Sequence, residues 1–140
     1  MIRKHIDDFT VIGTDHCPFD LNLKKASYTS QIPMGIGGIR YSFVNMFTEF
    51  GPSIIAKFTD GPAKAYGMYP GKGTLIPGAD GDLVIFDDNQ EEVINDTDSV
   101  YHGKKLKGKV LDVFLRGQQI VQNGTFSGSQ GKYISRKLNG

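Results

Sequence analysis

Asp15 and His16 are neighbouring residues whose side chains together could do chemistry. A carboxylate beside an imidazole can bind a divalent metal ion or act as a general base. The same pair could instead form a turn, with Asp15 capping it and His16 lying partly exposed in a loop. A metal site needs at least three ligands, and neither His5 nor His102 belongs to an HxH, HxxH or HExxH pattern. The residues alone leave both interpretations open.

The segment before this pair must position it. Phe9–Gly13 has the sequence FTVIG, which predicts a buried strand because it is apolar, β-branched and too short for a helix. Asp15 and His16 would then follow the C-terminal end of a strand, where α/β folds bind ligands. Residues 21–38 come next as a long loop that ends rich in glycine, a kind of segment that is usually functional or mobile.

Two helices are predicted after this loop. Arg40–Phe50 places apolar side chains on two adjoining faces, which is typical of a largely buried helix. Pro52 can open a second helix that continues to Tyr66. Gly61-Pro62 should divide it into two pieces, because proline lacks the N–H that a helix interior needs.

The sequence becomes β-rich from Met68 to Gly124. Short apolar or alternating runs separated by turn residues predict strands at Gly73–Ile76, Asp82–Phe86, Lys109–Leu115 and Gln118–Gln122. Arg116-Gly117 and Asn123-Gly124 are predicted turns. We therefore divide the chain into residues 1–67, residues 68–124 and a polar tail, residues 125–140.

Composition argues against two classes of partner. Lys and Arg number 16 against 15 Asp and Glu, so the chain lacks the basic excess of a nucleic-acid-binding face. No apolar run approaches the roughly 20 residues that span a bilayer, and the first residues, MIRKHIDD, do not form a secretory signal. The single cysteine, Cys17, fits a reducing compartment. We expect a soluble, cytoplasmic protein without nucleic acid or membrane as a partner.

Three longer segments together resemble the C-terminal part of the cyclic amidohydrolases in the dihydropyrimidinase and hydantoinase group, to which dihydroorotase and allantoinase are related. The segments are VIGTDHCPF at 11–19, IPMGIGGIRYSFVNMFTE at 32–49 and DGPAKAYGMYPGKGTLIPGADGDLVIFD at 60–87. They are similar, in order, to the family's final barrel strand, to its substrate loop with the following helix, and to its passage from the barrel into a small sandwich.

The resemblance implies an α+β fragment. It would contain the last strand and helices of a metal-dependent (β/α)8 barrel, in residues 1–67, followed by the C-terminal half of a small β-sandwich. The parent enzyme would hold two metal ions, usually zinc, and hydrolyse a carbon–nitrogen bond of a cyclic amide. Asp15 matches the family's metal-binding aspartate, which also shuttles a proton. His16 would orient Asp15 or contact the substrate.

The substrate loop departs from the family pattern. Pro33, Met34 and Gly35 belong to this substrate loop, which reads IPMG where the family usually has IPNG, so Met34 replaces an asparagine that holds the ring amide. A thioether cannot make those hydrogen bonds, so the identity of the substrate is open. The family's NPAK sequence is DGPAK here, which keeps a residue able to cap a helix, Asp60.

The family's other metal ligands would all lie before Met1, so we expect this chain alone to bind no metal and to be inactive. Helix side chains that would have faced the barrel are left exposed in such a fragment, so self-association or domain swapping is expected. They are Phe43, Phe47, Ile55 and Phe58. A non-catalytic assembly or scaffold module of the same fold is the alternative, although retention of Asp15 argues against it. A third possibility is a free-standing small-molecule binding module.

Overall fold

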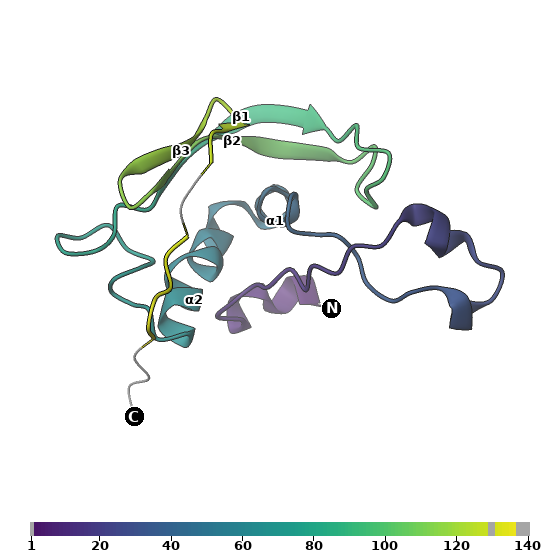
Figure 1. The fold of residues 1–140 in the computed structure, drawn as a ribbon, viewed down its shortest axis with the longest axis horizontal. Coiled ribbons are helices and arrows are strands. Elements are labelled where there is room, and N and C mark those ends of the chain that lie inside the picture. Colours follow the sequence, from purple (N-terminus) through teal and green to yellow (C-terminus); the bar gives the residue numbers. More distant parts are fainter. Residues whose placement is uncertain (1, 129–130, 137–140) are drawn as a thin grey trace.

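The computed structural model describes residues 2–128 and 131–136 and shows helices beneath one face of an antiparallel sheet (Figure 1). The elements are η1 (Ile2–Asp8), η2 (Leu21–Lys25), η3 (Thr29–Gln31), α1 (Ser42–Phe50), η4 (Gly51–Phe58), α2 (Asp60–Ala65), β1 (Leu83–Val93), β2 (Lys105–Leu115), β3 (Gln118–Gln122) and β4 (Thr125–Phe126). The η elements are 3-10 helices. None of the helices in the described part is both long and apolar enough to cross a membrane.

The predicted helices form, but the second one breaks earlier than expected. Its first piece is the 3-10 helix η4, and the break falls at Thr59, where φ is −121° and ψ is −94°. Gly61 and Pro62 lie in the first turn of α2, where the missing proline N–H costs no hydrogen bond. Asp60 is the first residue of this helix and Thr59 occupies the N-cap position, so Asp60 is not the cap; its carboxylate accepts a hydrogen bond from Lys64 Nζ at 2.7 Å.

The sheet has the strand order β1-β2-β3-β4, with antiparallel pairing throughout. Arg116-Gly117 joins β2 to β3 with φ values of 51° and 78°, which confirms the predicted hairpin turn. Asn123-Gly124 makes the second predicted turn, with φ values of 49° and 77°. β4 continues the sheet into the segment expected as a tail. The strand predicted at residues 73–76 is wrong: this segment forms bends between α2 and β1.

An aromatic cluster joins the helices to the sheet. Phe43 and Phe47 of α1 lie with their ring centres 5.3 and 4.8 Å from that of Phe86 in β1. Gly108 of β2 makes room for this ring, since a β-carbon there would lie 2.1 Å from Phe86 Cζ. Phe47 is 5% exposed. The expectation that Phe47 is left exposed is therefore wrong, Phe43 and Phe58 are half-buried, and Ile55 is exposed as expected.

The predicted strand at residues 9–13 is also wrong. No strand is assigned to this segment, and it is not part of the sheet formed by β1 to β4. It lies instead along η4, where Lys57 Nζ donates to the Phe9 carbonyl at 2.6 Å. The Ile12 N–H donates to the Lys57 carbonyl at 3.1 Å. A helix therefore satisfies the polar groups that a neighbouring strand would otherwise bond.

Candidate functional site

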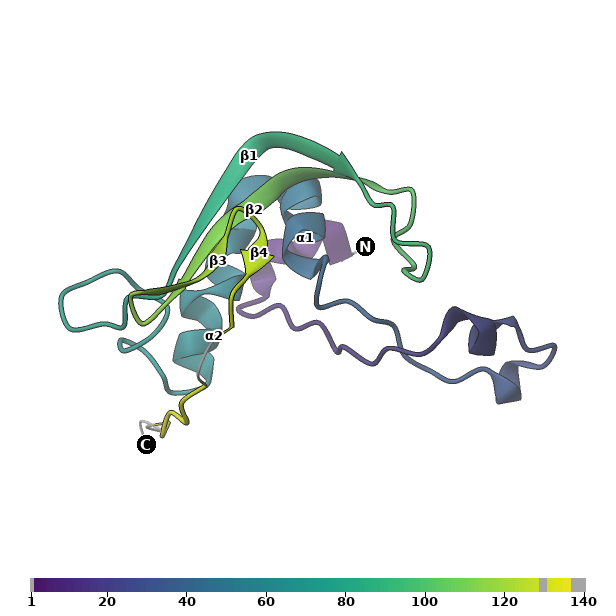
Figure 2. The ribbon, with the colours of Figure 1, turned by 45° about the horizontal axis from the view of Figure 1, so that its top comes forward.

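Residues 14–38 form an arm that extends away from the helices and the sheet (Figures 1 and 2). Its two limbs run side by side where His16 forms an isolated parallel bridge with Ile36. The Cys17 N–H donates to the Ile36 carbonyl at 3.1 Å. The arm thereby brings the predicted Asp15-His16 pair beside the predicted substrate loop.

Asp15 lies at the point where the chain enters the arm. Its φ is 45°, in the left-handed region that aspartate and asparagine adopt more readily than most residues. The residue is exposed. Its carboxylate accepts no hydrogen bond or ion pair from the residues that the structure describes, which leaves both oxygens available to a ligand.

His16 is oriented by the opposite limb of the arm. Its Nδ1 accepts hydrogen bonds from the backbone N–H groups of Gly38, at 3.0 Å, and Ile39, at 3.2 Å. An Nδ1 that accepts two hydrogen bonds carries no proton, so the neutral ring is protonated on Nε2. The chemistry left to His16 is therefore donation of a hydrogen bond from Nε2.

The predicted substrate loop packs closely against the first limb. Gly35 has a φ of 129°, and a β-carbon there would lie 2.6 Å from the Cys17 carbonyl oxygen. Met34 is 89% exposed. Pro33 is half-buried. The loop thus exposes the methionine side chain to solvent, and its backbone at Gly35 lies against the first limb of the arm.

Sequence reasoning missed Lys24, which contacts this loop from η2. Its Nζ donates to the carbonyls of Pro33 and of Gly35, the latter at 2.7 Å. The same nitrogen lies 5.1 Å from the centre of the Phe19 ring. A lysine in a polar segment has no spacing signal that distinguishes it from a solvated one, so nothing in the sequence singled it out.

The described residues do not by themselves assemble a metal site. No three or more His, Cys, Asp or Glu side chains of residues 2–128 and 131–136 come close enough to hold an ion. Asp15 supplies one possible oxygen ligand, and the Nδ1 of His16 already accepts two backbone hydrogen bonds. The geometry provides part of a polar site and no complete ligand set.

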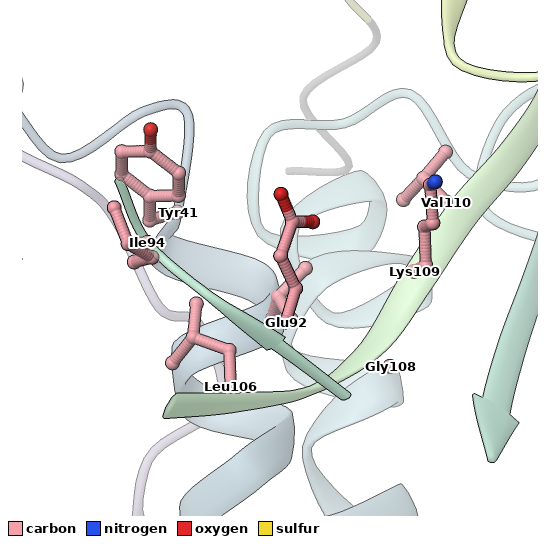
Figure 3. A pocket seen from close by; sticks show the side chains of 8 residues that line it. Tyr41, Glu92, Ile94, Leu106, Gly108, Lys109 and Val110 are labelled. Carbon is pink, nitrogen blue, oxygen red and sulfur yellow. The ribbon is translucent and has the colours of Figure 1, made fainter. Parts of the chain in front are cut away.

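A separate small pocket lies between the sheet and the first turn of α1 (Figure 3). Its volume is about 120 Å³, and it is lined by Tyr41, Val44, Glu92, Ile94, Leu106, Gly108, Lys109 and Val110. Burial and a 3.1 Å hydrogen bond to Asp96 raise the pKa of Tyr41. The lining contains none of the predicted site residues, and the volume is below the roughly 300 Å³ of typical ligand pockets. The arm remains the candidate site.

Comparison with known proteins identifies the family. The model of the amidohydrolase family matches residues 2–120, so the chain belongs to that family. The D-hydantoinase of Streptomyces coelicolor is 33% identical over 141 residues, which cover 89% of this chain and 30% of that protein. The D-phenylhydantoinase of Escherichia coli is 31% identical over 147 residues, covering 91% and 32%.

Solved structures agree with this membership. One D-hydantoinase structure superposes with a TM-score of 0.88 at 27% identity, covering 97% of this chain and 34% of that one. A second has a TM-score of 0.79 at 31% identity, covering 92% and 32%. The predicted resemblance to the hydantoinase group is confirmed. The chain spans about a third of the length of the curated relatives it matches.

Proposed function

We propose that this chain is part of a metal-dependent hydrolase that opens a carbon–nitrogen bond of a cyclic amide. The observation that carries the proposal is the arm, in which Asp15 and His16 lie beside the predicted substrate loop. The similarity to proteins named D-hydantoinase supports this substrate class.

In this proposal Asp15 accepts and returns a proton, and it contributes one oxygen ligand to a divalent metal ion, for which zinc is the expected element. The remaining ligands would come from other parts of a longer protein. His16 donates from Nε2 to a carbonyl oxygen of the substrate, because its Nδ1 is already hydrogen-bonded. Pro33, Met34 and Gly35 line the substrate side. The chain by itself is proposed to be inactive.

Exposed apolar side chains support packing against the rest of such a protein or against a second copy. The arm carries several of them, namely Phe19, Leu23, Tyr28, Met34 and Ile36, which are 40–89% exposed. Removing large apolar side chains from water stabilises an assembly by about 1.5–3 kcal/mol each. We therefore propose that the isolated chain self-associates.

The proposal is tested by replacing the matched third of the Streptomyces coelicolor D-hydantoinase with this chain. Hydrolysis of hydantoin, substituted hydantoins and dihydrouracil is then followed by product formation. Asp15→Asn should lower kcat by about 10²–10⁴-fold, as loss of a general acid–base does. Asp20→Asn is the matched control, because Asp20 is an exposed carboxylate that only caps η2.

A graft that keeps the host's mass and metal content but opens no cyclic amide would contradict the proposal. That result would favour the scaffold interpretation. Activity that survives Asp15→Asn would contradict the role given to Asp15.

A further inference from the structure

The loop around Met34 is held by one cation. Lys24 Nζ donates to two carbonyls two residues apart, those of Pro33 and Gly35. Lys24 is half-buried, and its Nζ also lies over the Phe19 ring. An ammonium group has three N–H donors, and here two of them meet carbonyls while the aromatic ring faces the charge.

This bonding pattern fixes the shape of the loop. Extended backbone points successive carbonyls to opposite sides, and the carbonyls of residues i and i+2 share a side. One cation that bonds both therefore holds one side of this segment, while the residue between them, Met34, is 89% exposed. Gly35 allows the close approach to the first limb, because a φ of 129° strains other residues and a β-carbon there would lie 2.6 Å from the Cys17 carbonyl oxygen.

Adjacent polar groups in the arm depend on the same path of the loop. The Ile36 carbonyl accepts from Cys17 N–H, and Gly38 N–H donates to His16. Both bonds need the chain after Gly35 to run alongside the first limb. Lys25, the neighbouring lysine, makes its one hydrogen bond among the described residues to Asn22 in η2, at 3.2 Å. Both lysines carry the same charge and lie in the last turn of η2, but Lys24 bonds to the loop and Lys25 bonds within η2.

We propose that Lys24 is a positioning residue of the substrate loop. Through the Pro33 and Gly35 carbonyls it holds the loop in the conformation that binds substrate. Its effect is on substrate binding, since a preformed loop loses less freedom when substrate docks. The part of this inference that concerns substrate rests on the function proposed above. The part that concerns loop order rests on the contacts alone.

The first experiment measures backbone ¹⁵N order parameters in the full 140-residue chain. We expect the values for Met34, Gly35 and Ile36 to fall from about 0.85, the level of an ordered backbone, to below about 0.6 in Lys24→Met. Lys25→Met should leave them unchanged, and Lys24→Arg should restore them in part, because guanidinium also donates to two carbonyls. Unchanged order in Lys24→Met overturns the proposal. Loss of the β1 and β2 amide signals in that variant also overturns it, since Lys24 would then stabilise the whole fold.

The second experiment uses the grafted hydrolase. Lys24→Met should raise KM about tenfold with kcat within about threefold of the unsubstituted graft, which is the pattern of lost binding rather than lost chemistry. A fall in kcat of about tenfold with an unchanged KM would overturn the role in substrate binding. An inactive unsubstituted graft refutes the proposed function, while the order parameters still decide whether Lys24 holds the loop.

Discussion

Gly61 and Thr10 touch across 51 positions of the chain: a β-carbon on Gly61 would lie 2.3 Å from the Thr10 carbonyl oxygen. The same β-carbon would lie 2.9 Å from the Ala56 carbonyl oxygen. Both obstacles are backbone atoms, which cannot rotate away. The glycine therefore allows the segment that leads to Asp15 to lie directly on α2.

Gly61→Ala should destabilise the chain by about 1–3 kcal/mol, the usual range for overpacking. The loss should appear even though alanine favours a helix over glycine by about 1 kcal/mol. Urea unfolding followed by circular dichroism measures it. Gly13→Ala is the control, because a β-carbon there meets nothing within 4 Å. Equal stability of the two variants would show that the segment does not pack on α2 as described.

Lys72 lies between two carboxylates and stabilises the segment that precedes β1. Lys72 Nζ lies 2.9 Å from Asp80 and also donates to Asp82, which accepts the Arg116 N–H at 2.8 Å. Burial alone would raise the pKa of Asp82, but the hydrogen bonds from Lys72 and Arg116 outweigh it and lower that pKa. Burial alone would lower the pKa of Lys72, and its bonds to Asp82 and Asp80 raise it instead.

The stability of the chain should consequently fall in acid. A carboxyl whose folded pKa lies below its unfolded value of about 4 stabilises the fold above that pH, and the stabilisation is lost as pH falls through the folded pKa. Asp82→Asn should cost about 1–3 kcal/mol at pH 7 and should flatten the decline below about pH 5. Urea midpoints at pH 7, 5 and 3 measure both effects. Asp88→Asn, at an exposed position, should change neither.

The contact between Phe47 and Phe86 should dominate the attachment of the helices to the sheet. Phe47→Ala should cost about 3–5 kcal/mol, because the side chain is 5% exposed and its removal leaves a cavity. A double-mutant cycle with Phe86→Ala should give a coupling of about 0.5–1.5 kcal/mol for the edge-on ring pair. Phe126→Ala, at a residue 64% exposed, is the control. Additive effects at the two rings would contradict direct packing.

The isolated chain should bind less than one zinc ion per molecule after dialysis. The described residues bring together no three or more ligand side chains, and two ligands hold zinc weakly. Elemental analysis gives the metal content, and light scattering on the same sample gives the mass, which should exceed that of one chain. Two metal ions per chain would mean that these residues build a site by another arrangement. A stable monomer would contradict the proposed self-association.

Patterns local to one element predicted much of this fold. The helix at α1, the turns at Arg116-Gly117 and Asn123-Gly124, and the β-rich second part all follow from residue type and spacing. The strand at residues 9–13 was wrong because an apolar β-branched run specifies extended backbone without specifying its partner. Here the partner is η4, which lies more than 40 residues further along the chain.

The candidate site was predictable only in outline. The Asp15-His16 pair and the Met34 loop are candidates from the sequence, and the arm brings them side by side. The tautomer of His16 depends on two backbone N–H groups, which carry no residue signature. The hydrogen bonds from Lys24 to the loop likewise depend on backbone carbonyls, which every residue possesses. Long-range contacts with backbone atoms are the part that no sequence pattern encodes.

The arm leaves the body and returns to it at nearly one point. A β-carbon on Gly38 would lie 3.5 Å from the carbonyl oxygen of Thr14, so the two ends are in contact. A segment whose ends already touch can be exchanged for another of different length at little cost, because loop-closure entropy rises by only about 0.6 kcal/mol per doubling of length. The arm can therefore change in length and sequence as one unit while the helices and the sheet stay as they are.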